Sequence, residues 1–144
     1  AREQAERRKP EQAELELLRQ KVRVSYSPLD IGDIAQVFDG DPKTFIRSFE
    51  ANPLEITLSF SQPVELRGVS MLIGNAASRL VVEVTSPDSQ TPLEFSAEIG
   101  PQEAYRTLEV PFGSALQVQS LCLRLYDLDQ SEPGHVHLWE VSLQ

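Results

Sequence analysis

The sequence has 144 residues, enough for one domain with a sizeable core, and its single Cys122 excludes an intrachain disulfide. Its net charge of −9 arises from 22 Asp and Glu against 13 Lys and Arg. An acidic body repels phosphate groups, which argues against nucleic acid as a partner, and no apolar stretch is long enough for a transmembrane segment.

Residues 1–21 are predicted to form a helical lead-in or stalk. Glu, Gln, Ala, Leu, Arg and Lys dominate this segment, and no β-branched residue occurs before Val22. Pro10 suits the first turn of a helix that restarts there. Leu15, Leu18 and Val22 then recur at helical spacing and form a narrow apolar stripe, which could rest on the following domain or on a partner helix. A connecting stalk is the expected role, with self-association through the N-terminal helix as the alternative.

Residues 22–144 are predicted to form an all-β domain, a jelly-roll β-sandwich of about eight strands. Apolar and polar residues alternate with a period of two in short runs, which Pro, Gly, Asn, Asp and Ser separate. The spacing of the runs is typical of a sandwich or jelly roll rather than of βαβ units. The predicted strands cover residues 22–26, 54–60, 69–73, 80–84, 93–99, 108–110, 121–125 and 135–143.

The segment between the first two strands contains the most informative motif. Apolar residues in 28–38 do not alternate, which indicates a helical turn leading into Asp39-Gly40-Asp41. Two carboxylates separated by one glycine, with the hydroxyl of Thr44 three residues further on, can surround a hard cation with oxygen atoms. The alternative is an acidic turn in which Asp39 caps nearby N–H groups without a metal.

Sequence motifs of catalysis are missing from the chain. It has no G-x-S-x-G, no P-loop, no G-x-G-x-x-G, no H-E-x-x-H and no C-x-x-C pattern. His135 and His137 lie two apart on a predicted strand and could supply two zinc ligands, although a third would have to come from elsewhere. The sequence therefore favours a protein that is not an enzyme.

Four segments in order resemble the galactose-binding-like jelly-roll domains, the group that contains the discoidin or coagulation-factor type C domains. Residues 37–46 (VFDGDPKTFI) resemble the opening motif of that group. Residues 53–60 and 63–71 resemble the next two strands, and residues 137–141 (HLWEV) resemble the closing strand. The resemblance covers roughly residues 22–144 and leaves the lead-in outside it.

The resemblance implies a structural calcium ion between the D-G-D loop and the closing strand. Carried over by position, Asp39 and Glu140 would supply carboxylates, and Thr44 would supply its hydroxyl and carbonyl oxygens. Gln36, Asp41 and Trp139 would supply mainly backbone carbonyls. Oxygen ligands of this kind suit calcium better than zinc.

The sequence also departs from the family pattern. Ile46 stands where members often have Trp, and the paired terminal cysteines of animal members are missing, which favours a bacterial-type version. Trp139 is expected to pack within the closing strand. Sugar-binding members use loop aromatic residues with Arg, His or Asn, and the candidates for ligand contact at loop positions here are Arg47, Phe49, Asn52, Asn75, Arg79 and Tyr105.

The leading functional hypothesis is a non-catalytic binding module that recognises a glycan. It would belong to a larger extracytoplasmic (periplasmic or cell-surface) or membrane-associated protein. The alternative is a structural or protein–protein interaction domain without a working sugar site. A third hypothesis, a hydrolase using Asp39, Asp41 or Glu140, rests only on the clustering of carboxylates.

Overall fold

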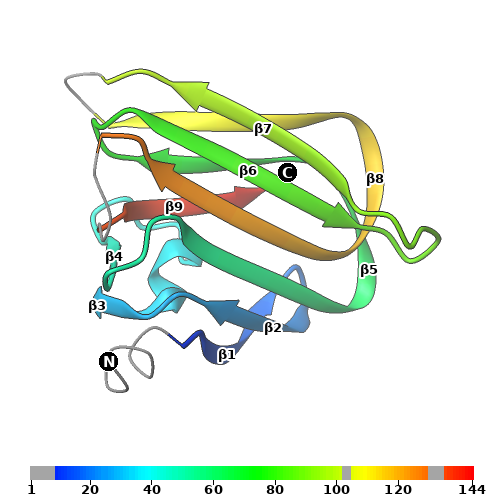
Figure 1. Cartoon of the computed structure of the whole chain (residues 1–144). Helices are drawn as coiled ribbons and strands as arrows, with labels where there is room; N and C mark the ends of the chain where they lie inside the picture. The colour runs from blue at the N-terminus through cyan, green and yellow to red at the C-terminus, as the bar shows by residue number, and fades with distance from the viewer. Residues whose placement is uncertain (1–8, 102–104, 130–134) are drawn as a thin grey trace.

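A computed structural model describes residues 9–101, 105–129 and 135–144, and it confirms the all-β prediction (Figure 1). Its strands and its one 3₁₀ helix follow the chain in this order: β1 (Glu11–Leu17), β2 (Gln20–Tyr26), β3 (Leu29–Ile31), η1 (Ile34–Phe38), β4 (Ile46–Ser48), β5 (Leu54–Ile73), β6 (Ser78–Thr85), β7 (Leu93–Ile99), β8 (Arg106–Asp127) and β9 (His137–Leu143). The predicted helical turn before Asp39 is present as η1.

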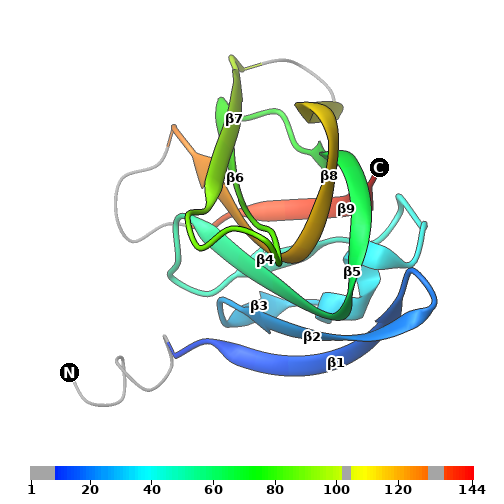
Figure 2. The same cartoon turned by 90° about the vertical axis from the view of Figure 1, so that its right-hand side faces the viewer.

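Two long strands, β5 and β8, bend and contribute to both layers of a sandwich (Figure 2). Their pairing is antiparallel throughout, and its register shifts between Ser59 and Val64, where β5 turns. The bend of β8 includes Gly113, which has a φ of 82° that glycine adopts without strain. Each long strand therefore joins two of the runs that the sequence pattern predicted as separate strands.

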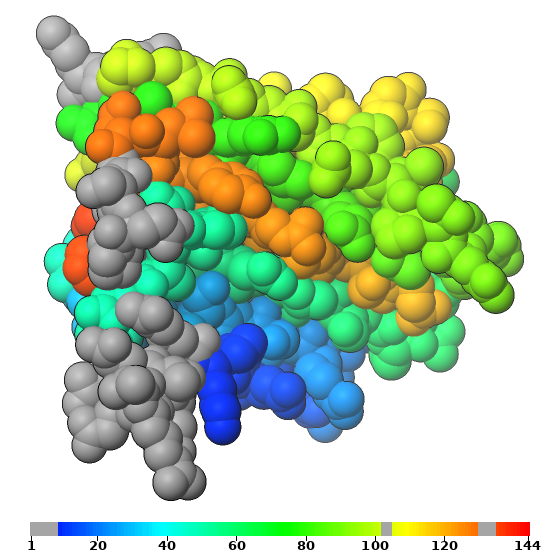
Figure 3. Space-filling view, viewed as in Figure 1, coloured from blue at the N-terminus to red at the C-terminus, as the bar shows by residue number. Residues whose placement is uncertain are grey.

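The strand pairings define the two layers. One layer has the order β1-β2-β5-β8-β6-β7 and uses the first part of β5 and the second part of β8. The other has the order β3-β4-β9-β5-β8 and uses the remaining parts of the two long strands. Figure 3 shows the second part of β8, in orange, between the green side chains of β6 and β5.

The core lies between the layers and consists of the alternate apolar residues of each strand. Ile56, Leu58, Leu121 and Leu123 are fully buried, as the period-two pattern predicted. Each such side chain contributes about 1.5–3 kcal/mol of burial free energy. The same cluster includes Ile46, which is fully buried.

The predicted N-terminal helix is wrong for the described part of residues 1–21. Residues 11–26 form a β-hairpin in which Leu15 pairs with Val22. Leu18 and Arg19 have φ values of 52° and 64°, which fit a two-residue type I′ turn. Leu18, expected on a buried stripe, is 47% exposed at this turn. Residues 1–8 lie outside the described structure.

Tertiary pairing explains why helix propensity failed in this segment. Ala13, Leu15 and Leu17 alternate with glutamates and pack against the core, while Glu14 and Glu16 are exposed. β2 pairs with β5, so the hairpin extends the sandwich, and burial on one face outweighs the preference of Glu and Leu for helix. Self-association through an N-terminal helix is therefore not supported.

Within residues 9–101, 105–129 and 135–144, no helix has the length and apolar character that crossing a bilayer requires.

Candidate functional site

Side-chain caps shape the short helix η1 that precedes the D-G-D loop. The backbone N–H of Ala35 donates to Oδ1 of Asp33 at 3.0 Å, and the N–H of Asp33 donates to Oε1 of Gln36 at 2.8 Å. This reciprocal pair is a capping box, and it occupies the side chain of Gln36. The backbone carbonyl of Gln36 is thus the group left to act as a metal ligand.

The D-G-D loop then folds on its own carboxylates. The N–H of Asp41 donates to Oδ1 of Asp39 at 2.8 Å, and the N–H of Lys43 donates to Oδ1 of Asp41 at 2.9 Å. The hydroxyl of Thr44 donates to the carbonyl of Asp41 at 3.4 Å. Gly40 between the two aspartates has a φ of 77°, which favours glycine. The loop therefore has the geometry of an acidic turn in which Asp39 accepts a nearby backbone N–H.

Strand β9 places Glu140 against this loop. Burial raises the pKa of Glu140 to about 7, and a hydrogen bond with Asp39 and the charge of Asp39 act in the same direction. A hydrogen bond from the backbone of Gly40 partly offsets this rise in the pKa of Glu140. Atom Oε1 of Glu140 is buried without a hydrogen-bond partner in the described structure. The carboxyl groups of Asp39 and Glu140 thus lie together, and one oxygen of Glu140 is buried without a partner. A bound cation would stabilise the charged form of both groups.

The fit of this site to a metal depends on oxygen ligands. In the described part of the chain, no group of three or more His, Cys, Asp or Glu side chains is arranged to hold a metal ion. Asp39 and Glu140 are the two carboxylates that meet, and calcium accepts backbone carbonyls for the rest of its coordination. A metal centre among the described residues would therefore need backbone carbonyls as ligands beside the carboxylates of Asp39 and Glu140.

A β-bulge in β9 separates this loop contact from a second surface. β5 pairs Leu72 with Glu140 but Ile73 with Leu138, so that Trp139 is the extra residue. Leu138 is fully buried on the core side, whereas Trp139 and Glu140 are both partly exposed. The bulge thus lets two consecutive residues lie outside the core.

Aromatic rings surround Trp139. Its ring centroid lies 5.1 Å from that of Phe45, 4.7 Å from that of Tyr105 and 6.2 Å from that of His137. Gly74 lies beside the same indole, and a Cβ at Gly74 would be 3.3 Å from it. Tyr105 is 63% exposed, so this aromatic cluster reaches the surface.

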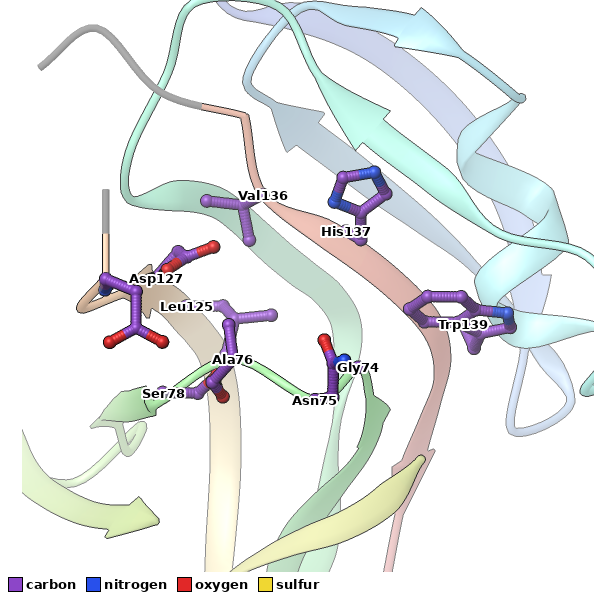
Figure 4. A pocket seen from close by; sticks show the side chains of 10 residues that line it. Gly74, Asn75, Ala76, Ser78, Leu125, Asp127, Val136, His137 and Trp139 are labelled. Carbon is purple, nitrogen blue, oxygen red and sulfur yellow. Dashed lines mark hydrogen bonds between the residues drawn. The ribbon is translucent and has the colours of Figure 1, made fainter. Parts of the chain in front are cut away.

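A pocket of about 420 Å³ adjoins the aromatic cluster; we call it the loop pocket (Figure 4). It lies where the β5–β6 connection meets the end of β8 and the start of β9. His137 and Trp139 project from β9, and Asp127 lies on the side opposite Trp139 (Figure 4). The aromatic and polar side chains of its lining are His137, Trp139, Asn75, Ser78, Asp127 and Asp129.

Hydrogen bonds to the backbone hold the walls of the loop pocket. Arg106, which is 9% exposed, donates to the carbonyls of Asn75 and Ala76 from behind the β5–β6 connection. The N–H of Ala77 donates to Oδ2 of Asp129 at 2.9 Å, and the N–H of Asp129 donates to Oδ1 of Asp127 at 2.9 Å. These bonds tie the two loops into one preformed wall.

The environment of His137 disfavours the charged form of its imidazole. Burial lowers the pKa of His137 below its ordinary value, and the positive charge of Arg47 lowers it further. Its ring centroid lies 5.7 Å from that of Phe45. His137 thus offers the pocket a polar aromatic ring, and the neighbouring His135 places Nδ1 2.8 Å from the carbonyl of Ser48.

The six predicted ligand contacts are distributed over the surface. Asn75 lines the loop pocket, and Tyr105 touches its Trp139. Arg47 donates two hydrogen bonds to Asp30, at 2.9 and 2.6 Å.

The other three predicted contacts do not line the pocket. Asn52 donates to and accepts from the backbone of Asp127. Arg79 lies 3.7 Å from Glu98 on the neighbouring strand, and the partly buried Phe49 donates its N–H to Pro28.

As ligand contacts, sequence reasoning missed five aromatic and polar side chains of the loop pocket, namely Ser78, Asp127, Asp129, His137 and Trp139. The sequence analysis predicted that Trp139 packs within the closing strand. The β-bulge at Trp139 does not change the alternation of apolar residues, so the sequence pattern gave no sign of it. The aromatic pair of residues 137 and 139 at period two was the available signal, since such residues share a face of a strand.

Comparison with solved structures gives several matches to the fold. A family 32 carbohydrate-binding module of C. perfringens NanJ in complex with galactose has a TM-score of 0.62 and 11% identity, over 85% of this chain and 92% of that chain. An F5/8 type C domain from Bacteroides fragilis has a TM-score of 0.64 and 13% identity, over 92% and 95% of the two chains.

A Ruminococcus gnavus GH29 fucosidase in complex with fucose has a TM-score of 0.66 and 15% identity, over 85% of this chain. The match spans 24% of the fucosidase chain, so this chain corresponds to about a quarter of that enzyme's length. No protein-family model and no curated protein matches the sequence. These matches show that the chain shares the fold of the family 32 carbohydrate-binding module and of the F5/8 type C domain, in agreement with the predicted jelly-roll β-sandwich.

Proposed function

We propose that this domain is a non-catalytic module that binds a carbohydrate in the loop pocket. The observation that carries the proposal is the juxtaposition of Trp139 and His137 with the polar groups of Asn75, Asp127 and Asp129 in one pocket. The C–H face of a sugar ring is apolar and packs on an aromatic ring, while its hydroxyls need hydrogen-bond partners at fixed positions. The pocket offers both kinds of contact.

The arrangement of the carboxylates supports binding over hydrolysis. Glycoside hydrolysis ordinarily needs two carboxyl groups that flank the scissile bond from opposite sides. In the loop pocket, Asp127 and Asp129 lie on the same wall and each accepts a backbone N–H. Asp39 and Glu140, the other pair, contact each other. Neither pair has the arrangement that hydrolysis requires.

A calcium ion is proposed as the structural partner of the D-G-D loop. Asp39 and Glu140 would hold it with their carboxylates, and the backbone oxygens of Gln36, Asp41, Thr44 and Trp139 would complete the set. The buried, unpaired Oε1 of Glu140 supports this ligand set. The ion would fasten the loop before β4 to the closing strand β9, and its role would be to stabilise the scaffold. It would not contact the sugar.

The parent protein is proposed to be extracytoplasmic, either periplasmic or at the cell surface. Glycans are common ligands outside the cytoplasm. Calcium concentrations there are also high enough to occupy weak calcium sites. Two of the matched structures contain a bound sugar, galactose in the NanJ module and fucose in the fucosidase, and this supports the proposal of a glycan ligand.

Sugar titration of three variants tests the proposed function. Calorimetry with a panel of monosaccharides should detect binding to the wild type. Trp139→Ala removes the aromatic wall, and Asn75→Ala removes a polar side chain without touching the backbone carbonyl that Arg106 holds. Each should weaken binding by about five- to 150-fold, because loss of a stacking or polar contact costs roughly 1–3 kcal/mol. Leu93→Ala, at an exposed position on β7, is the matched control.

The alternative of a protein–protein interaction domain makes a different prediction. Every sugar would fail to bind, and light scattering would show association with a partner or with a second copy. Wild-type affinity in both Trp139→Ala and Asn75→Ala would also count against the loop pocket as the sugar site.

A further inference from the structure

Tyr105 presents an open aromatic ring beside the loop pocket. It is 63% exposed, the largest value among the exposed large apolar side chains of the described residues. Its ring centroid nonetheless lies 4.7 Å from that of Trp139, with 45° between the ring planes. The ring of Tyr105 therefore packs against Trp139 and leaves most of its own surface to solvent.

This ring lies at one end of the loop pocket. Trp139 lines the pocket on the side opposite Asp127 (Figure 4). Tyr105 contacts the indole of Trp139, yet it is not one of the residues that line the pocket. The aromatic surface therefore continues from Trp139 beyond the pocket, and a single sugar ring that fills the pocket does not need Tyr105.

Aromatic packing holds this extension in place. The indole of Trp139 contacts the rings of both Phe45 and Tyr105, with centroid distances of 5.1 and 4.7 Å. The three residues come from separate parts of the chain, namely the loop before β4, the segment before β8 and strand β9. A ring packed in this way keeps few orientations in the free protein, so little conformational entropy is lost when a ligand covers it. Tyr105 is thus a preorganised contact surface.

A glycan chain has the chemistry to cover the pocket and this ring together. Each sugar ring has an apolar C–H face and a rim of hydroxyls, and successive rings are joined through one glycosidic oxygen. When one ring occupies the pocket, the next ring is therefore held close to the edge of the pocket. The phenol ring of Tyr105 can pack on the C–H groups of that second ring, and its hydroxyl can donate and accept hydrogen bonds.

We propose that Tyr105 forms a second sugar subsite, so that the domain binds glycan chains of two or more units more tightly than single sugars. The proposal rests on the proposed sugar-binding function and adds the length of the ligand. The observation that carries it is the contact of the exposed Tyr105 with Trp139 at the end of the pocket.

Matched ligands of one and two sugar units test the proposal. For each monosaccharide that the wild type binds, calorimetry would compare the methyl glycoside with the disaccharides of the same unit in every linkage. For galactose these are methyl β-galactoside and the galactobioses. At least one disaccharide should bind about three- to tenfold tighter, which is the range for one added aromatic contact. Raising the salt concentration should leave this gain unchanged, because the phenol ring adds no charge.

Variants connect the gain to the ring of Tyr105. Tyr105→Ala should abolish the gain from the second unit, while the affinity for the methyl glycoside should change by less than about twofold, because Tyr105 does not line the pocket. Tyr105→Phe retains the ring and should keep most of the gain. Leu93→Ala removes another exposed apolar side chain, on β7, and should change neither affinity.

The outcomes separate failure of this subsite from failure of the sugar site. Binding of no sugar of either length would overturn the proposed function and this inference with it. Disaccharides that all bind no tighter than the methyl glycoside would overturn the subsite and leave the pocket standing. A gain that Tyr105→Ala retains would place the second unit elsewhere and overturn the subsite. An equal loss for both ligands in Tyr105→Ala would also overturn it, because Tyr105 would then act only by supporting Trp139.

Discussion

Trp139 and Glu140 are consecutive in the sequence, yet they serve two separate surfaces of the domain. Trp139 lines the loop pocket, and Glu140 contacts Asp39 in the D-G-D loop. The bulge in β9 produces this division, because the register of the β5–β9 pairing shifts at Trp139. A single strand thus connects the proposed sugar site to the proposed calcium site.

Calcium should raise the melting temperature of the domain. An ion that binds only the folded state stabilises it by about 2.7 kcal/mol when its free concentration is 100 times the Kd. Scanning calorimetry in excess calcium and in chelator would measure the difference. Asp39→Ala should abolish it, whereas Asp88→Ala, at an exposed acidic position, should retain it. Identical melting curves of the wild type in both buffers would exclude the site.

Glu140→Gln should have opposite effects with and without calcium. The pKa of Glu140 is raised to about 7 from an ordinary 4.5 in the folded metal-free chain, so its contribution to stability is lost as the pH rises toward 7. A glutamine mimics the neutral form, and the variant should be at least as stable as the wild type at pH 8 in chelator. In calcium the variant lacks a carboxylate ligand and should be the less stable protein. Equal effects in both buffers would count against a metal ligand at this position.

Arg19→Gly should stabilise the chain. Arg19 has a φ of 64° in the β1–β2 turn, and a non-glycine residue in that region costs roughly 1–2 kcal/mol. Urea unfolding should therefore show a gain of about 1 kcal/mol. A helix over the same residues predicts the reverse, since glycine costs about 1 kcal/mol there. Arg19→Ala is the control, because alanine would favour the helix but not the turn.

Gly32→Ala should destabilise the protein more than Gly40→Ala. Both glycines have positive φ values, 85° and 77°, so both substitutions introduce backbone strain. A Cβ at Gly32 would also lie 2.6 Å from the carbonyl oxygen of Phe45, while at Gly40 it would meet nothing within 4 Å. Strain alone costs roughly 1–2 kcal/mol, and the clash adds about 1–3 kcal/mol. Unfolding in urea would compare the two variants, and equal losses would show that the contact at Gly32 relaxes freely.

The strands could be predicted from the sequence because burial on one face leaves a period of two. Residues 93–99 were predicted with the bounds of β7 itself. The predicted runs 54–60 and 69–73 both lie within β5, and 108–110 and 121–125 both lie within β8, whereas the short strands β3 and β4 were not predicted. The hairpin of residues 11–26 could not be predicted in the same way. Its turn uses Leu18 and Arg19, which lack the Asn-Gly signature of a type I′ turn, and its Glu-rich face has a high helix propensity.

The two sites differ in how far the sequence could predict them. The family resemblance implied that Asp39 and Glu140 lie together, and in the structure the two carboxyl groups interact. The loop pocket brings together residues 74–78, 125–129 and 136–139, which lie far apart in the sequence. Only Asn75 of its polar lining was predicted, because the tertiary fold brings these three segments together. The bulge that turns Trp139 outward also leaves no trace in the alternation of apolar residues.

Chemical-shift mapping of the ¹⁵N-labelled protein during titration with a neutral sugar such as galactose would test the central claim most directly. We predict that the largest shifts occur at the amides of Asn75, Ser78, Asp129 and His137 and at the indole N–H of Trp139. Shifts confined to another surface, such as the connection between β6 and β7, or no shifts with any sugar of the panel, would contradict a sugar site in the loop pocket.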